Sequence, residues 1–153
     1  MKNILILILF LSLSSNLFSQ KQYGHIGVGI LSFKGISDFS INANFGARGK
    51  NAGGGVKLLF SEPWGLISLA EGRLFIQPDK NNTVSLGFGI GARLKDKTTF
   101  AASVNVNYSF KFKGKIGPYI EAGFLPLKDK RYLLGEKIVI NYSTYIFTAG
   151  IAF

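Results

Sequence analysis

The chain has 153 residues, of which 47% are hydrophobic, and it carries a formal net charge of +10 at pH 7 and no cysteine. That length suits a single domain. The lack of cysteine excludes a disulfide, a thiolate metal site and a lipid-anchored N-terminal cysteine. The positive charge is compatible with nucleic acid, with an anionic membrane surface or with basic turns alone.

The first 19 residues have the pattern of a secretory signal peptide. Met1-Lys-Asn is a short positive start, an apolar run occupies 4–13, and a more polar segment with small residues follows. The apolar run is too short to cross a bilayer as a helix, which needs about 20 residues. A buried N-terminal helix is the alternative. We expect residues 1–19 to be removed and residues 20–153 to form the mature domain. Export argues against a nucleic-acid partner.

In chain order, the remaining sequence predicts eight β-strands separated by turn-forming residues. In the clearest segments, apolar residues alternate with small or polar ones, a period of two that is typical of strands and not of helices. Glu71 and Arg73 share a parity with apolar residues, and a bulge near Gly72 could switch the register there. The link 126–137 alone is long enough to be a recognition loop. We expect strands at 23–33, 37–47, 54–61, 64–76, 84–94, 100–112, 116–125 and 139–153.

An even number of antiparallel strands with short links closes into an up-and-down barrel, which removes unpaired edges. The less apolar parity is mostly Gly, Ser, Ala and Asn, and most lysines lie in the turns. A soluble barrel would instead show charged and hydroxyl side chains along its strands. We therefore expect small residues to line a narrow lumen and bulky ones to face lipid. The aromatic residues expected in interfacial girdles are Phe33, Trp64, Tyr108, Phe110, Tyr145 and Phe153.

The last nine residues, 145–153, alternate in the same way up to a terminal Phe153. This segment resembles the C-terminal targeting strand of bacterial outer-membrane β-barrel proteins. The mature chain as a whole resembles small eight-stranded outer-membrane proteins of the OmpA/OmpX type. The resemblance implies a monomer in the Gram-negative outer membrane, reached through the periplasm, with both termini periplasmic. It implies outer-membrane lipid, lipopolysaccharide and the barrel-assembly machinery as partners. The assembly signal would consist of Tyr145, Phe147, Ile151 and Phe153.

Charged residues within the expected strands need a polar environment, because an Arg or Lys facing lipid costs about 2–4 kcal/mol at the membrane midplane. We expect them to face the lumen and to pair there, since both signs are present. Such a network is either a plug that holds the barrel shut or the gate of a narrow pore. A lumen of about eight strands leaves little room for water, which favours the plug. The predicted lumen charge network consists of Lys57, Glu71, Arg73, Arg93 and Glu121, with Asp38 as a further inward charge.

The residues available argue against catalysis. The chain has one histidine, His25, and no Gly-x-Ser-x-Gly segment, whereas a serine hydrolase needs an activated serine with a histidine and an acid. We expect His25 to be a hydrogen-bonded lumen or interface residue. One histidine without cysteine also argues against a metal site. We expect a non-enzymatic barrel without a cofactor, in a structural or surface-interaction role. The alternatives are a narrow porin-like pore and a soluble ligand-binding barrel of lipocalin type.

Overall fold

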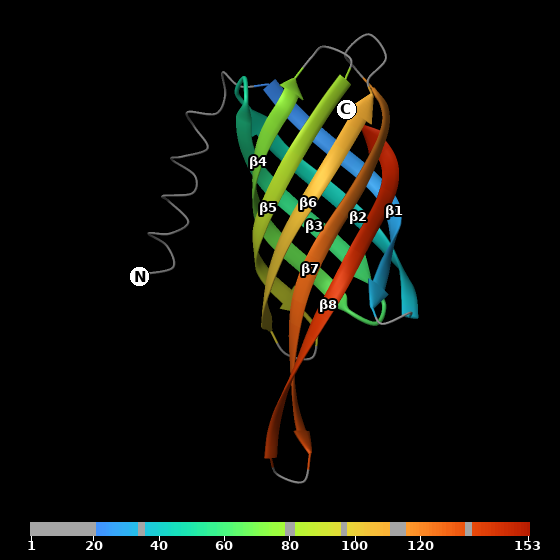
Figure 1. The fold of residues 1–153 in the computed structure, drawn as a ribbon, viewed down its shortest axis with the longest axis vertical. Helices are drawn as coiled ribbons and strands as arrows, with labels where there is room; N and C mark the ends of the chain where they lie inside the picture. The colour runs from blue at the N-terminus through green and yellow to red at the C-terminus, as the bar shows by residue number, and fades with distance from the viewer. Residues whose placement is uncertain (1–20, 34–35, 79–81, 96–97, 111–115, 134–135) are drawn as a thin grey trace, which may run out of the picture.

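A computed structural model describes residues 21–33, 36–78, 82–95, 98–110, 116–133 and 136–153, so the predicted signal peptide lies outside the described residues. All eight predicted strands are present, and the all-β class is confirmed (Figure 1). No helix in this part of the chain has the length and apolar character required to cross a membrane. The strands are β1 Lys21–Phe33, β2 Ile36–Arg48, β3 Ala52–Ser61, β4 Gly65–Pro78, β5 Asn82–Leu94, β6 Thr99–Phe110, β7 Gly117–Leu133 and β8 Glu136–Ala152.

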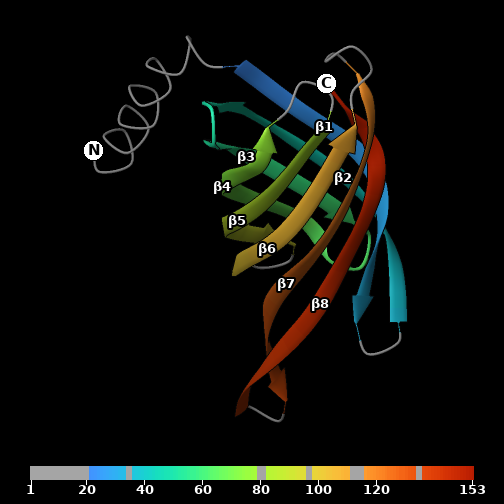
Figure 2. The ribbon, with the colours of Figure 1, turned by 45° about the horizontal axis from the view of Figure 1, so that its top comes forward.

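The strands form one closed barrel in which each strand runs antiparallel to the next and β8 pairs with β1, as the sequence predicted. The β1–β8 seam pairs His25 with Ala152. Next to that pair, Gly24 and Phe153 exchange two backbone hydrogen bonds of 2.9 Å. The start of β1 and the end of β8 therefore share one end of the barrel, the termini end. β7 ends and β8 begins at the opposite end, which is called the hairpin end (Figures 1 and 2).

The two parities of the strands divide between the outer wall and the interior as predicted. On β8, Tyr145 and Phe147 are 54% and 56% exposed, whereas Ile146 and Ala152 are fully buried. Every strand contributes to the same outward apolar surface. Examples on the other strands are Val28, Ile41, Phe60, Leu74, Phe88, Val106 and Ile120.

β7 and β8 are longer than expected and extend beyond the barrel as a two-stranded hairpin (Figure 2). Their pairing continues to Leu133 and Glu136, whereas β6 pairs with β7 only as far as Leu127 and β1 pairs with β8 only as far as Tyr145. The recognition loop predicted at 126–137 is therefore wrong, because all but two of its residues belong to the two strands. The ladder between β7 and β8 continues without a break from Gly117↔Ala152 to Leu133↔Glu136.

The register switch predicted near Gly72 is wrong as well. β4 keeps a single parity, so Glu71 and Arg73 face inward together with Phe75. The bulge lies between Phe75 and Gln77, near the end of the strand, and Gly72 is paired regularly. The barrel interior accepts the apolar residues of this parity, so β4 has no need to turn them outward.

Candidate functional site

The barrel interior contains four charged side chains in mutual contact, which we call the charged layer: Lys57 on β3, Glu71 and Arg73 on β4, and Glu121 on β7. Lys57 Nζ forms an ion pair with Glu121. Arg73 Nε donates a hydrogen bond to Glu71 Oε1 at 2.9 Å, and Arg73 Nη2 lies 4.0 Å from Glu121 Oε2. None of the four residues is more than 5% exposed. The two cations and two anions therefore balance inside the barrel.

Buried amides add hydrogen bonds to the two carboxylates. Asn44 Nδ2 donates to Glu71 Oε1 at 2.8 Å, and Asn105 Nδ2 donates to Glu71 Oε2 at 3.0 Å. Asn107 Nδ2 lies 3.5 Å from Glu121 Oε2. A buried charge is tolerated only when it is paired and hydrogen-bonded. These asparagines therefore belong to the site, although the sequence indicated only that their parity would line the lumen.

Aromatic side chains lie on the termini side of the charged layer. His25 Nδ1 is 3.2 Å from Arg73 Nη1, and the His25 ring is stacked on Tyr119 with ring centroids 4.8 Å apart. Tyr23 packs edge-on against Phe75 at 5.7 Å. His25 is 5% exposed, so it lies in the lumen, one of the two places expected for it.

Glycines on the inner wall make room for these large side chains. A Cβ at Gly87 would lie 2.5 Å from Asn105 Oδ1. Tyr119 passes over two glycines at the β1–β8 seam: a Cβ at Gly27 would lie 2.7 Å from its hydroxyl, and a Cβ at Gly150 would lie 2.7 Å from its Cε1. The small inward residues of the alternation are therefore required by specific neighbours.

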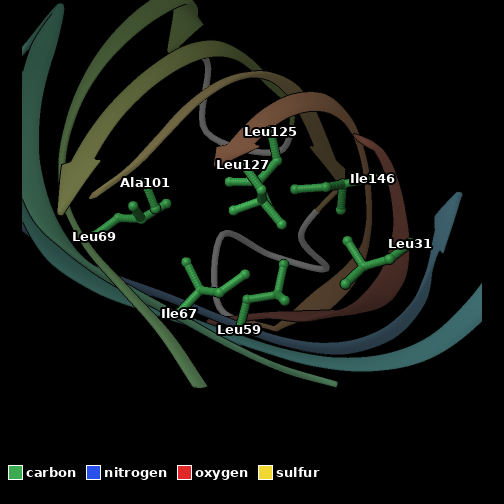
Figure 3. Close-up of a cluster of buried hydrophobic side chains, with 8 residues drawn as sticks. All are labelled: Leu31, Leu59, Ile67, Leu69, Ala101, Leu125, Leu127 and Ile146. Atoms are coloured by element: carbon green, nitrogen blue, oxygen red, sulfur yellow. The ribbon is translucent and has the colours of Figure 1, made fainter. Parts of the chain in front are cut away.

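An apolar cluster fills the interior on the hairpin side of the charged layer. Its eight side chains converge from six strands (Figure 3), and each is at most 1% exposed. This apolar layer departs from the expectation that bulky apolar residues face lipid. The sequence nevertheless contains a signal for it in the parity of β4. Ile67 and Leu69 lie on the same face of this strand as the inward-facing charges Glu71 and Arg73. The apolar layer consists of Leu31, Leu59, Ile67, Leu69, Ala101, Leu125, Leu127 and Ile146.

Three rings at the hairpin end contact one another above the apolar layer. The ring centroids of Phe33 and Trp64 lie 4.8 and 5.2 Å, respectively, from the ring centroid of Tyr142. Trp64 and Tyr142 also pack against the apolar layer. Trp64 Nε1 donates a hydrogen bond to Asp38 Oδ2 at 3.2 Å. The girdle prediction is therefore wrong for Phe33 and Trp64: Phe33 shares the inward parity of Leu31, and Trp64 packs onto the interior.

Arg93 lies in a different layer from the other predicted network residues. Its Nε donates to Thr99 Oγ1 at 3.1 Å, and its Cζ lies 5.9 Å from the centre of the Trp64 ring. The register explains this position, because Arg93 pairs with Ile67 of the apolar layer. Glu71 is four residues farther along β4, a distance of about 13 Å at the usual rise of a strand.

The four residues of the predicted assembly signal lie on the outer wall, at the seam that closes the barrel. Their exposed fractions range from 43% for Phe153 to 56% for Phe147. The Phe153 ring lies over Gly24 of β1 and 6.1 Å from the ring of Phe45. The terminal side chain is thus held by β1 and β2 in the closed barrel.

The four side chains of the charged layer can neutralise one another inside the barrel. Within the described residues, no group of three or more His, Cys, Asp or Glu side chains could hold a metal ion. The large side chains of Arg73 and Lys57 and of the apolar layer are almost inaccessible to solvent.

No protein-family model matches the chain, and no curated protein matches its sequence. Among solved structures, the chain is similar to the crystal structure of Neisserial surface protein A. The two share 12% sequence identity with a TM-score of 0.54, and the likeness covers 86% of this chain and 93% of that chain. At this identity the likeness is one of fold. Together with the closed eight-stranded barrel, it confirms the fold that the sequence resemblance to small outer-membrane barrels predicted.

Proposed function

We propose that the protein is an integral outer-membrane β-barrel whose lumen is filled by its own side chains, with a structural or surface-interaction role and no enzymatic activity. The outer wall supports the membrane location. On β6 the outward residues run from Phe100 to Phe110. The ten residue steps between them, on a strand tilted by about 40°, rise about 25 Å, the height of the apolar band of outer-membrane barrels.

The observation that carries the filled lumen is the burial of its largest polar side chains. Arg73 and Lys57 are each 1% exposed, and Ile67 and Leu125 of the apolar layer are 0% exposed. A water-filled channel would leave the side chains along its path exposed. This burial favours a plug over a narrow pore, and it leaves little space for the ligand of a lipocalin-type barrel.

The surroundings of His25 support a structural role for it. An arginine can only donate hydrogen bonds, so the Arg73 contact uses His25 Nδ1 as an acceptor. The ring is also stacked on Tyr119. A catalytic base must be able to reach a substrate, whereas this imidazole lies inside the filled lumen.

Localisation and partners follow from the same proposal. The protein would cross the periplasm before insertion, with the strand ending in Phe153 read by the barrel-assembly machinery. It would function as a monomer among outer-membrane lipid and lipopolysaccharide.

Two measurements test the proposal. Cell fractionation with a heat-modifiability gel should recover the protein in the membrane fraction, with a mobility that shifts on boiling. Purified protein in planar bilayers should give no steady conductance, because both the charged and the apolar layers close the lumen. Recovery as a soluble periplasmic protein would end the membrane assignment. A steady, salt-dependent conductance would replace the plug by the narrow pore.

A further inference from the structure

We propose that three cations at the termini end, Lys21, Arg48 and Lys50, bind the headgroups of anionic phospholipids in the leaflet that surrounds this end of the barrel. We call these three residues the basic rim. The inference rests on the proposed membrane location and adds to it a class of lipid and the surface that binds this lipid.

The strand register gathers the basic rim at the same end of three adjacent strands. Lys21 and Arg48 form the last pair of the β1–β2 ladder. Lys50 lies in the turn between β2 and β3, where Gly49 N donates a backbone hydrogen bond to Ala52 O at 2.8 Å. Lys21 and Lys50 are exposed, and Arg48 is half-buried. The three cations therefore form one local patch at the end of the barrel.

The basic rim belongs to the more positive end of the barrel. Within the residues that the structure describes, the ion pairs all lie in the charged layer, so none of them includes a residue of the basic rim. In the sequence, the three links between strands at the termini end, 49–51, 79–81 and 111–116, contain five lysines and one acid, Asp79. The four links at the hairpin end contain three lysines and two acids. Positive charge is therefore concentrated at the termini end.

The pairing of Lys21 with Arg48 favours an anion between them. The Cβ atoms of directly paired residues lie about 5 Å apart, and like charges at such positions are destabilising. Arg48 Cζ lies 5.1 Å from the centre of the Phe75 ring, and this contact holds the guanidinium at the rim. A lipid phosphate between the two cations would replace their repulsion by charge-assisted hydrogen bonds.

The depth of the basic rim matches that of the lipid headgroups. Phe45 and Phe153 are outward rings that are 44% and 43% exposed, with centroids 6.1 Å apart, and aromatic rings flank the apolar band of outer-membrane barrels. Arg48 follows Phe45 by three residues, a rise of about 8 Å on a strand tilted by about 40°. The headgroup region extends about 5–8 Å beyond the hydrocarbon core on each side. The basic rim therefore lies level with the phosphates of the surrounding leaflet.

An anionic phospholipid fits this surface better than a zwitterionic one. The phosphate of phosphatidylglycerol is not balanced by a cation in the same headgroup, whereas that of phosphatidylcholine is. A lysine near an anionic membrane surface contributes attraction equivalent to about a fivefold preference. Its apolar stem can lie along the wall while the ammonium reaches the phosphate. The exposed Lys21 and Lys50 therefore supply the selectivity, beside an arginine that Phe75 holds in place.

The test measures which lipid gathers at the basic rim. The chain has no cysteine, so Gln22→Cys, at an exposed position beside Lys21, can carry a single fluorophore. Barrels refolded in phosphatidylcholine vesicles receive a small fraction of nitroxide-labelled phosphatidylglycerol or nitroxide-labelled phosphatidylcholine as quencher. At low salt, the local concentration of the phosphatidylglycerol should be about fivefold higher. A fluorophore at Ile36→Cys, which is 65% exposed at the hairpin end, should report less than about a twofold difference.

Three variants of the labelled protein localise the effect. Lys21→Gln/Lys50→Gln should lower the enrichment to less than about twofold, because it removes both exposed charges. Lys21→Arg/Lys50→Arg keeps the charges and should keep the enrichment. Lys95→Gln/Lys128→Gln is the matched control: it removes two charges at the hairpin end and should also keep the enrichment.

Equal quenching by the two lipids at residue 22, or full enrichment in Lys21→Gln/Lys50→Gln, would overturn the inference alone. If inorganic phosphate removed the enrichment and sodium chloride of the same ionic strength did not, the basic rim would be a small-anion site and not a lipid surface. Quenching of neither fluorophore by either lipid would overturn the membrane location and the inference with it. Should Lys21→Gln/Lys50→Gln fail to fold, the two fluorophore positions decide, since equal enrichment at both ends would overturn the proposal.

Discussion

The ion pair between Lys57 and Glu121 gives the sharpest prediction about what holds the interior together. Their side chains are 1% and 3% exposed, so solvent screens the pair very little. Replacing Glu121 by Gln leaves Lys57 buried without its anionic partner, which should cost about 3–5 kcal/mol in the free energy of unfolding. Lys57→Met should cost less, because Glu121 would keep Asn107 at 3.5 Å and Arg73 at 4.0 Å.

The double variant Lys57→Met/Glu121→Gln removes both charges together. Buried ion pairs can often be replaced by uncharged residues with little loss. The double variant should therefore be at least about 2 kcal/mol more stable than Glu121→Gln alone. The combination Arg93→Gln/Glu121→Gln is the matched control. Arg93 lies in the layer of Thr99 and Trp64, so its effect should add to that of Glu121→Gln within about 0.5 kcal/mol.

Urea unfolding in lipid vesicles measures all of these free energies, with the heat-modifiability gel as a check that each variant forms a barrel. Additive effects of Lys57→Met and Glu121→Gln would refute the reasoning. Additivity would mean that the two side chains are separately solvated, and the lumen would then contain enough water to screen them.

The remaining predictions concern the wall of the barrel. Gly150→Val should abolish the heat-modifiable form, because a Cβ at residue 150 would collide with the backbone carbonyl of Ile26. Gly72→Ala is the control. It should fold normally, since a Cβ at residue 72 meets no atom within 4 Å. Deleting Phe153 should lower the amount of inserted protein in cells and increase periplasmic proteolysis, as measured by fractionation and immunoblotting. Normal insertion of the deletion variant would mean that the terminal ring serves packing alone.

Much of the barrel could be predicted because alternation fixes both strand identity and parity. The strand predicted at 23–33 begins only two residues after the observed start of β1 at Lys21. The inward positions of Lys57 and Glu121 could be predicted because a charged side chain facing lipid is costly. Alternation places Leu125 and Leu127 on the inward parity of Glu121, but it does not show that they meet leucines of other strands in one layer. Only the three-dimensional closure of the barrel decides which leucines meet.

The ends of β7 and β8 were missed for a different reason. The segment after Pro126 contains several charged residues in a row, a composition typical of loops. A backbone ladder between two strands does not itself require an alternating sequence, because its hydrogen bonds join main-chain groups. The ladder of the last two strands therefore continues to Leu133 and Glu136 without the pattern that identifies strands within the wall.

The charged layer also explains how a strand with apolar residues on both parities keeps its register. A shift of one residue moves every side chain of a strand to the opposite face. On β4, Leu69 faces inward and Leu74 faces outward, so hydrophobicity alone barely distinguishes the two arrangements. A slip would place Glu71 and Arg73 against lipid, and the arginine alone would cost about 2–4 kcal/mol near the midplane. Lys57 on β3 has the same effect, because it lies between two outward residues of that strand. The charges therefore specify which apolar residues face the interior, even where their net contribution to stability is small.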